Sequence, residues 1–286
     1  MERYDIAIIG SGPSGLSAAI NAKVRNKNII IFGNSNLSRS LVLAPKVNNY
    51  LGFYGISGTE LRDKFQKHID DMNININTEK VNNIYAMGEY FAIMTANKTY
   101  EAKKVILALG IEHTKPIEGE DKLLGRGVGY CATCDAPLYR NKIVTILGYN
   151  KEAESEANYV SEMANKVYYI PMYKDEYELN DKVEIVKDKP LEIVGSGKVE
   201  KLVLKNTEIS TDGVFILKDS APPQQLVPGL EMEDGHIKVN RKMETNIEGC
   251  YAAGDCTGKP YQYMKAVGEG QVAALNAVEE LSSILK

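Results

Sequence analysis

The sequence predicts an α/β protein built from two three-layer, Rossmann-like domains, and two observations carry this prediction. First, an apolar strand, a glycine-rich turn and an apolar-periodic helix follow one another within residues 4–20. Second, the same order of strand, turn and helix returns within residues 141–156. Strands that alternate with helices favour parallel sheets covered by helices. The length of 286 residues accommodates two domains of the usual size, roughly 150 residues each.

Composition and charge exclude several classes of protein. The net charge of −4 and the lack of a basic tract argue against binding to nucleic acid or to an anionic membrane. No apolar run reaches the roughly 18 residues that a transmembrane helix needs. The N-terminus enters an apolar strand without the basic and apolar regions of a signal peptide, so we expect a cytoplasmic protein.

The first glycine-rich turn has the spacing GxGxxG between the strand Tyr4–Ile9 and a helix that begins near Leu16. In this context Gly10 allows the tight turn, Gly12 lets the backbone approach a pyrophosphate, and Gly15 allows close packing of helix on strand. The free N–H groups of the helix start favour the phosphates. The predicted dinucleotide-binding residues are Gly10, Ser11, Gly12, Pro13, Ser14 and Gly15.

The ligand at this turn is better explained by a flavin than by NAD. The strand Asn28–Phe32 ends in Gly33-Asn34, where the NAD fingerprint has an acidic residue for the ribose. Near the C-terminus, a short strand ends in Gly254-Asp255, and the Asp255 carboxylate could accept hydrogen bonds from the ribityl hydroxyls of a flavin. The helix predicted from Met264 onward starts with small residues, which permits close approach to a ligand.

The pair Cys131 and Cys134 is followed directly by Asp135. Three interpretations compete: a structural zinc site, two unrelated buried thiols, and a reversible disulfide. The zinc interpretation fits badly, because Cys250 and Cys256 have the wrong spacing to complete a four-ligand site, and we predict no metal. A Cys-x-x-Cys element lowers the pKa of a thiol and closes readily into a disulfide, so the pair can pass two electrons to a partner disulfide. Asp135 is the nearest candidate for the proton donor.

The second glycine-rich turn, by contrast, lacks the residues that bind phosphate. Asn150 takes the place of the middle glycine, and Glu152, Glu154 and Glu156 bring negative charge into the first turns of the helix. No arginine occurs between Arg140 and Arg241, although a site for the 2′-phosphate of NADPH normally has one. The alternative is an unusual phosphate site built from Lys151 and Lys174.

These motifs together resemble the low-molecular-weight thioredoxin reductases over essentially the whole chain. The resemblance is carried by Gly10–Gly15, Asn49-Tyr50, Gly125–Asp135, Ala252–Asp255 and the segment from Gln262 to Gly270. It implies a homodimer that reduces thioredoxin, with a split FAD domain of residues 1–112 and 239–286. The domain inserted between them, residues 113–238, would be of the pyridine-nucleotide type and carry the dithiol.

The resemblance also implies roles for individual residues. Cys134 would be the thiol next to the flavin, Cys131 would attack thioredoxin, and Asp135 would be the acid. Outside the first turn, the implied FAD-binding residues are Asn49, Gly110, Gly254, Asp255, Gln262 and Tyr263.

The departures from this family lie where NADPH would bind, since Pro171-Met172-Tyr173 stands at the position of the family's His-Arg-Arg run. Tyr261 likewise replaces the arginine that usually precedes Gln262. The pattern is similar to the ferredoxin-dependent flavin thioredoxin reductases, in which FAD takes single electrons from ferredoxin and passes a pair to the disulfide. Two alternatives stay open: an NAD(P)H-dependent disulfide reductase with an atypical nucleotide site, and a non-enzymatic redox-sensing flavoprotein.

Overall fold

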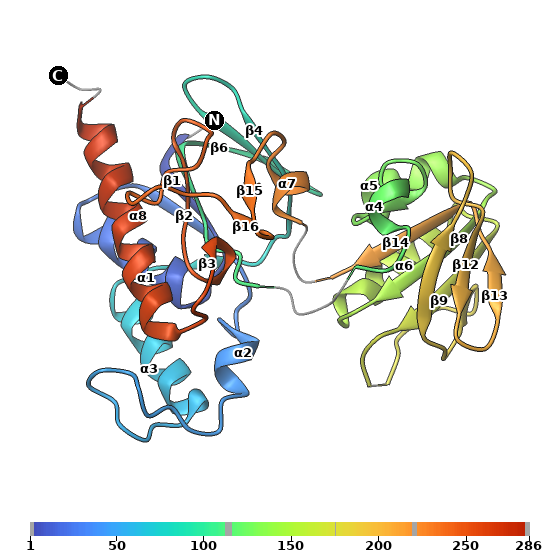
Figure 1. Cartoon of the computed structure of the whole chain (residues 1–286), viewed down its shortest axis with the longest axis horizontal. Helices are drawn as coiled ribbons and strands as arrows, with labels where there is room; N and C mark the ends of the chain where they lie inside the picture. Colours follow the sequence, from blue (N-terminus) through green and yellow to red (C-terminus); the bar gives the residue numbers. More distant parts are fainter. Residues whose placement is uncertain (1–2, 112–115, 175, 219–221, 284–286) are drawn as a thin grey trace. The chain divides into compact units, whose positions relative to one another are not determined.

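The computed structural model describes residues 3–111, 116–174, 176–218 and 222–283, and the chain divides into two compact units (Figure 1). One unit comprises residues 1–112 and 222–286, and the other comprises residues 113–221. The sequence placed the return to the first unit at residue 239, but Leu226, Val227 and Leu230 are already buried in the core of the first unit. The change of composition after Pro116 predicts a hinge around Ile111–Pro116, and this segment lies mostly outside the described residues, which omit 112–115.

The first unit is organised around a seven-stranded sheet that both ends of the chain build together. Its parallel part has the order β3 (Ile76–Asn77), β2 (Ile29–Phe32), β1 (Arg3–Ile9) and β6 (Thr99–Leu107), and β17 (Cys250–Ala252) also pairs with β6. The hairpin of β4 (Val81–Ala86) and β5 (Phe91–Thr95) continues the sheet from β6 in antiparallel fashion. Residues Thr99–Leu107 form one continuous strand.

Small residues let two helices of the first unit pack tightly against each other and against the sheet. Helix α1 (Pro13–Val24) and helix α8 (Tyr263–Ser283) share a core with alanines such as Ala18 and Ala273. A side chain at Gly270 would lie 2.0 Å from the carbonyl oxygen of Ser14, so only glycine fits there. The close approach therefore brings the start of α8 next to the first glycine turn.

Shorter elements complete the first unit: α2 (Arg39–Val42), α3 (Gly58–Asp71), α7 (Pro223–Leu226), the 3₁₀ helix η2 (Asp255–Thr257) and the pair β15 (Met232–Glu233) and β16 (His236–Ile237). Ser57 is the cap of α3, because its side chain accepts the N–H of Glu60 while the Glu60 carboxylate accepts the N–H of Ser57.

The second unit has a five-stranded parallel sheet. Its order is β10 (Val183–Ile185), β9 (Lys166–Pro171), β8 (Ile143–Gly148), β14 (Gly213–Leu217) and β7 (Val128–Gly129). A three-stranded antiparallel sheet is formed by β11 (Pro190–Val194), β12 (Lys201–Leu204) and β13 (Glu208–Ser210). The helical elements are α4 (Glu120–Leu123), α5 (Ala132–Asp135), the 3₁₀ helix η1 (Ala136–Tyr139) and α6 (Glu152–Ser161).

Both units thus have the Rossmann-like arrangement that the sequence predicted, with parallel strands and helices that alternate along the chain. Within the described residues, no helix is both long and apolar enough to cross a membrane.

Candidate active site

The first glycine turn leaves the start of α1 open. Gly12 is the N-cap of α1, no side chain caps the helix there, and a side chain added at Gly12 would meet no atom within 4 Å among the described residues. Gly10 has a positive φ of 117°, and an added Cβ would lie 2.1 Å from the carbonyl oxygen of Ala108. Gly15 is equally restricted, at 1.8 Å from the carbonyl oxygen of Gly10. The turn therefore has the close packing and the exposed N–H groups that a pyrophosphate site requires.

Two serines of this turn differ in what their hydroxyls do. The Ser11 hydroxyl donates to the carbonyl oxygens of Asn34 and Leu37, at 2.9 and 3.1 Å, and so holds the loop after β2. The Ser14 hydroxyl is buried and finds no hydrogen-bond partner in the described part of the chain. A buried polar group without a partner is costly, so Ser14 is suited to bond a ligand that occupies the turn.

The C-terminal segment brings further predicted residues to the same turn. A Cβ at Gly254, which has a φ of 93°, would lie 2.9 Å from the Cβ of Ser14. Asp255 follows directly at the start of η2. Gly110 lies beyond the end of β6, two residues after Ala108, and has a positive φ of 67°. The structure therefore places Gly254, from the C-terminal part of the chain, beside Ser14 at the start of α1.

A second pair of predicted residues is brought together across more than two hundred positions of sequence. The side-chain amide of Asn49 donates to the side-chain oxygen of Gln262 at 2.8 Å. Tyr263 begins α8 directly after Gln262, and burial raises the pKa of its phenol. The sequence could indicate these residues only through the family resemblance, because no local pattern connects Asn49 with Gln262.

Two residues that sequence reasoning missed support the Gly254 loop. Lys265 donates to the carbonyl oxygens of Gly254 and Gly258, at 3.0 and 2.6 Å. The carboxylate of Glu269 accepts the N–H of Gly254 at 2.9 Å and pairs with Lys265 at 3.1 Å. The spacing of four residues between Lys265 and Glu269 was the signal available in the sequence.

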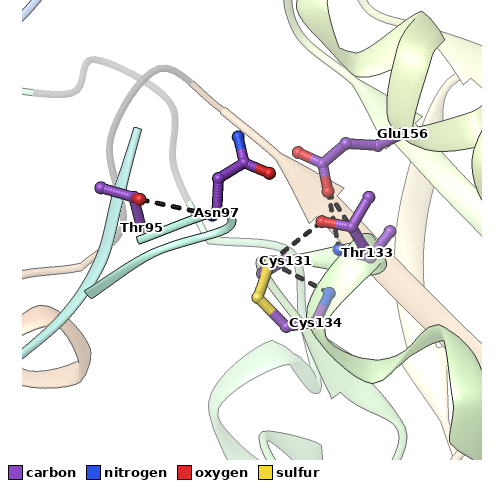
Figure 2. Close-up of a disulfide and its surroundings, with 7 residues drawn as sticks. Thr95, Asn97, Cys131, Thr133, Cys134 and Glu156 are labelled. Atoms are coloured by element: carbon purple, nitrogen blue, oxygen red, sulfur yellow. Dashed lines mark hydrogen bonds between the residues drawn. A yellow bond between two sulfur atoms is a disulfide. The ribbon is translucent and has the colours of Figure 1, made fainter. Parts of the chain in front are cut away.

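Cys131 and Cys134 form a disulfide at the start of α5, with their Cα atoms 5.4 Å apart (Figure 2). Cys131 is the N-cap of this short helix, and its sulfur accepts the N–H of Cys134 at 3.3 Å. Cys131 is half-buried and Cys134 is exposed. The disulfide thus lies at an accessible turn, where thiol–disulfide exchange is possible.

Asp135 is the last residue of α5 and is half-buried. Burial raises the pKa of its carboxyl group, because an apolar environment disfavours the charged form. At any given pH, a raised pKa increases the fraction of the carboxyl group that carries a proton to donate. This property is the one that the predicted proton donor needs.

The other two cysteines belong to the first unit and are not exposed. Cys250 and Cys256 are both free and buried in the core beside the sheet. Burial raises the pKa of the Cys250 thiol to about 12 and that of the Cys256 thiol to about 11. Both thiols therefore stay protonated and inert near neutral pH.

The second glycine turn is filled by side chains of the protein. The side-chain oxygen of Asn150 accepts the N–H of Ala153 at 3.0 Å, which satisfies part of the start of α6. The buried carboxylate of Glu154 accepts the hydroxyl of Tyr173 and, at 2.6 Å, the N–H of Glu178. A Cβ at Gly148 would lie 2.0 Å from the Tyr169 hydroxyl, so this ring lies directly over the turn.

The tyrosines of this network are held in their neutral form. Burial raises the pKa of Tyr169 to about 12, and burial together with the hydrogen bond to Glu154 raises that of Tyr173. The two hydroxyls lie 3.2 Å apart. Lys151, which the sequence offered as an alternative phosphate ligand, pairs with Glu178 at 2.8 Å.

The disulfide on a nucleotide-type fold, together with an open dinucleotide turn, defines the class of the pyridine nucleotide-disulphide oxidoreductases. The family model of that description matches residues 4–270. Among curated relatives, thioredoxin reductase from Bacillus subtilis is 33% identical over 99% of this chain and 97% of its own length.

Solved structures agree with this assignment. A ferredoxin-flavin thioredoxin reductase from Clostridium acetobutylicum is 76% identical, with a TM-score of 0.96 over 99% of both chains. A thioredoxin reductase from Gloeobacter violaceus is 26% identical, with a TM-score of 0.81 over 98% of this chain and 95% of that chain.

The chain therefore belongs to the thioredoxin reductases within this family. It is a thioredoxin-disulfide reductase, and the family's cofactor is FAD. This outcome confirms the predicted family, fold class and enzyme class, and it does not support the alternative of a non-enzymatic redox sensor.

Proposed function

We propose that this enzyme binds FAD at the open turn of the first unit, takes its electrons from reduced ferredoxin, and reduces thioredoxin through Cys131 and Cys134. The observation that carries the choice of donor is the filled second turn. The Asn150 side chain accepts an N–H at the start of α6, where a pyrophosphate would bond, and the nearby Glu154 adds a buried carboxylate that would repel phosphate. The resemblance at 76% identity to a protein described as a ferredoxin-flavin thioredoxin reductase supports the same donor.

The residues of the first unit fit FAD. The open start of α1 at Gly12 would hold the pyrophosphate, and the buried Ser14 hydroxyl would bond to the cofactor. Asp255, at the small-residue loop beside Ser14, would accept the ribityl hydroxyls, and the Asn49–Gln262 pair would line the site. FAD supplies the chemistry that joins one-electron and two-electron steps.

The dithiol carries out the reduction of thioredoxin by exchange. Two electrons and two protons convert the Cys131–Cys134 disulfide into two thiols. The Cys131 thiol then loses its proton, and its thiolate attacks the disulfide of thioredoxin, so that a mixed disulfide forms and a thioredoxin thiolate leaves and takes up a proton. The Cys134 thiol next loses its proton and attacks Cys131, which closes the original disulfide and releases the second thioredoxin sulfur, which is protonated in turn. Asp135 supplies the proton to a leaving thiolate.

An anaerobic titration tests the donor. Reduced ferredoxin should bleach the flavin absorbance of the purified enzyme and, with thioredoxin present, generate thioredoxin thiols. NADPH and NADH should leave the flavin oxidised over the same period. Prompt bleaching by micromolar NADPH would show that the donor is a nicotinamide and that the second turn still binds it.

Two further expectations follow from the resemblance and stay predictions: a homodimer and a cytoplasmic location. Sedimentation equilibrium of the holoenzyme checks the first, since a homodimer has twice the chain mass of 31.6 kDa.

A further inference from the structure

Glu156 of helix α6 bonds to the start of the helix that carries the disulfide. Its carboxylate accepts the N–H of Ala132 at 2.8 Å and that of Thr133 at 3.3 Å. Figure 2 shows Glu156 directed toward Thr133, next to the disulfide. These are the first two amides after Cys131. The sequence suggested only that Glu156 adds negative charge to α6, because the contact with α5 joins residues 24 positions apart.

The contact matters because of what amides at a helix start normally do for a cysteine. A thiolate at such a position is stabilised by the N–H groups and by their partial positive charge, which lowers its pKa. Here the carboxylate takes two of these N–H groups and brings its own negative charge close to Cys131. The sulfur of Cys131 keeps a hydrogen bond from the N–H of Cys134 and lies 3.5 Å from the Thr133 hydroxyl.

We propose that Glu156 is a positioning residue that makes the Cys131–Cys134 pair a stronger reductant. The negative charge disfavours a Cys131 thiolate, and the same two hydrogen bonds hold α5 in the turn that the closed disulfide requires. Reduction breaks the sulfur–sulfur bond and consumes two electrons, and it leaves two thiols when two protons are taken up or one thiol and a thiolate when one proton is taken up. The carboxylate penalises the thiolate product, and the equilibrium therefore shifts toward the disulfide. The inference rests on the proposed role of this pair as the donor to thioredoxin.

The variant Glu156→Gln separates charge from structure, because the glutamine side-chain oxygen can accept the same two N–H groups without a negative charge. The holoenzyme is equilibrated anaerobically in buffers of reduced and oxidised dithiothreitol, and the fraction of free Cys131 and Cys134 thiols is counted by alkylation and mass spectrometry. We expect the equilibrium constant for reduction to rise about tenfold, which corresponds to a potential about 30 mV less negative for a two-electron couple.

The matched control is Glu152→Gln, which removes the same charge from the exposed first turn of the same helix. It should leave the constant within about twofold, because a charge exposed to water is strongly screened. If Glu156→Gln has the constant of the parent enzyme while Glu156→Ala shifts it, the role of Glu156 is structural and the proposal is wrong.

A second measurement, the alkylation rate of Cys131, tests the proposal if the Glu156→Gln enzyme does not fold well enough for the equilibrium measurement. In the Cys134→Ser enzyme, iodoacetamide at neutral pH alkylates Cys131 at a rate set by its thiolate fraction. Adding Glu156→Gln should raise this rate several-fold, and an unchanged or lower rate would contradict the proposal. Failure of the proposed function is distinguishable, since neither measurement uses ferredoxin: a disulfide that dithiothreitol cannot open would disprove the dithiol role itself.

Discussion

The starts of helices α1 and α6 have the same place in two similar folds but opposite chemistry. At α1 the N-cap is glycine, no side chain covers the N–H groups, and the Ser14 hydroxyl lacks a partner within the described residues. At α6 the Asn150 side chain bonds an N–H, and the buried Glu154 is bonded by Tyr173 and Glu178. The fold therefore does not decide whether a helix start binds phosphate; the side chains that reach its N–H groups do.

The largest expected effect comes from giving α1 the acidic character of α6. Gly12→Glu adds a carboxylate where the structure has open space and a φ of −74°, so the fold should tolerate the change. Repulsion of the pyrophosphate should weaken FAD binding by roughly 1,000-fold, or about 4 kcal/mol. Flavin absorbance of the purified protein and FAD titration of the apoprotein measure the change.

The control for that prediction is Val24→Glu, which adds the same charge at the exposed far end of α1. It should leave the FAD content unchanged. If the Gly12→Glu protein retains tightly bound FAD, the proposal that this turn binds the pyrophosphate is wrong.

The second-largest effect is expected at the disulfide of the second unit, because the disulfide, and not the second glycine turn, should take part in the reaction. Asp135→Asn removes the acid and should slow thioredoxin reduction about 100-fold. Because the pKa of Asp135 is raised by burial, the acid form prevails at low pH and is lost as the pH rises through that pKa. The ratio of parent to variant rates should therefore fall as the pH increases. The exposed Asp181→Asn provides the control, and a ratio independent of pH would contradict the role.

A smaller effect is expected from opening the filled turn. Glu154→Ala leaves the Tyr173 hydroxyl and the Glu178 N–H without their acceptor, at a cost of about 2 kcal/mol in the stability of the second unit. Thermal unfolding by calorimetry measures the cost, with the exposed Glu152→Ala as control. NADPH should still fail to bleach the flavin, because Asn150 and Tyr169 continue to fill the turn. Bleaching in this variant would show that the carboxylate alone excludes the nucleotide.

The smallest effect concerns the open turn. Ser14→Ala should weaken FAD binding about fivefold, because one hydrogen bond worth about 1 kcal/mol is lost. The same change should stabilise the apoprotein slightly, because it removes a buried hydroxyl that has no partner there. Ser17→Ala is the matched control, since its hydroxyl donates to the carbonyl oxygen of Val267 at 2.7 Å and its loss should destabilise the apoprotein. Equal changes in apoprotein stability for the two variants would contradict the proposal that the Ser14 hydroxyl is reserved for a hydrogen bond to FAD.

Local patterns predicted much of this protein because the chemistry concerned is local. The turn from Gly10 to Gly15 and the pair Cys131 and Cys134 are set by spacing within a few residues, and the structure has the expected strand, turn and helix around the first and a disulfide at the second. The missing glycine at Asn150 was visible for the same reason. Boundaries were less accurate: residues 222–238 join the first unit because Leu226 and Ile237 pack on its core, a contact that no local pattern reveals.

The sequence by itself determined the open dinucleotide turn, the dithiol with its neighbouring Asp135, and the absence of arginines from the second turn. Only the tertiary structure decided what became of the second turn and of the start of α5. Tyr173 and Glu178 bond to Glu154 from 19 and 24 positions away, and Glu156 bonds to Ala132 from 24. Such bonds depend on how β9 and α6 pack around β8. Each bond is strong because burial excludes water from it, and this burial exists only in the folded chain.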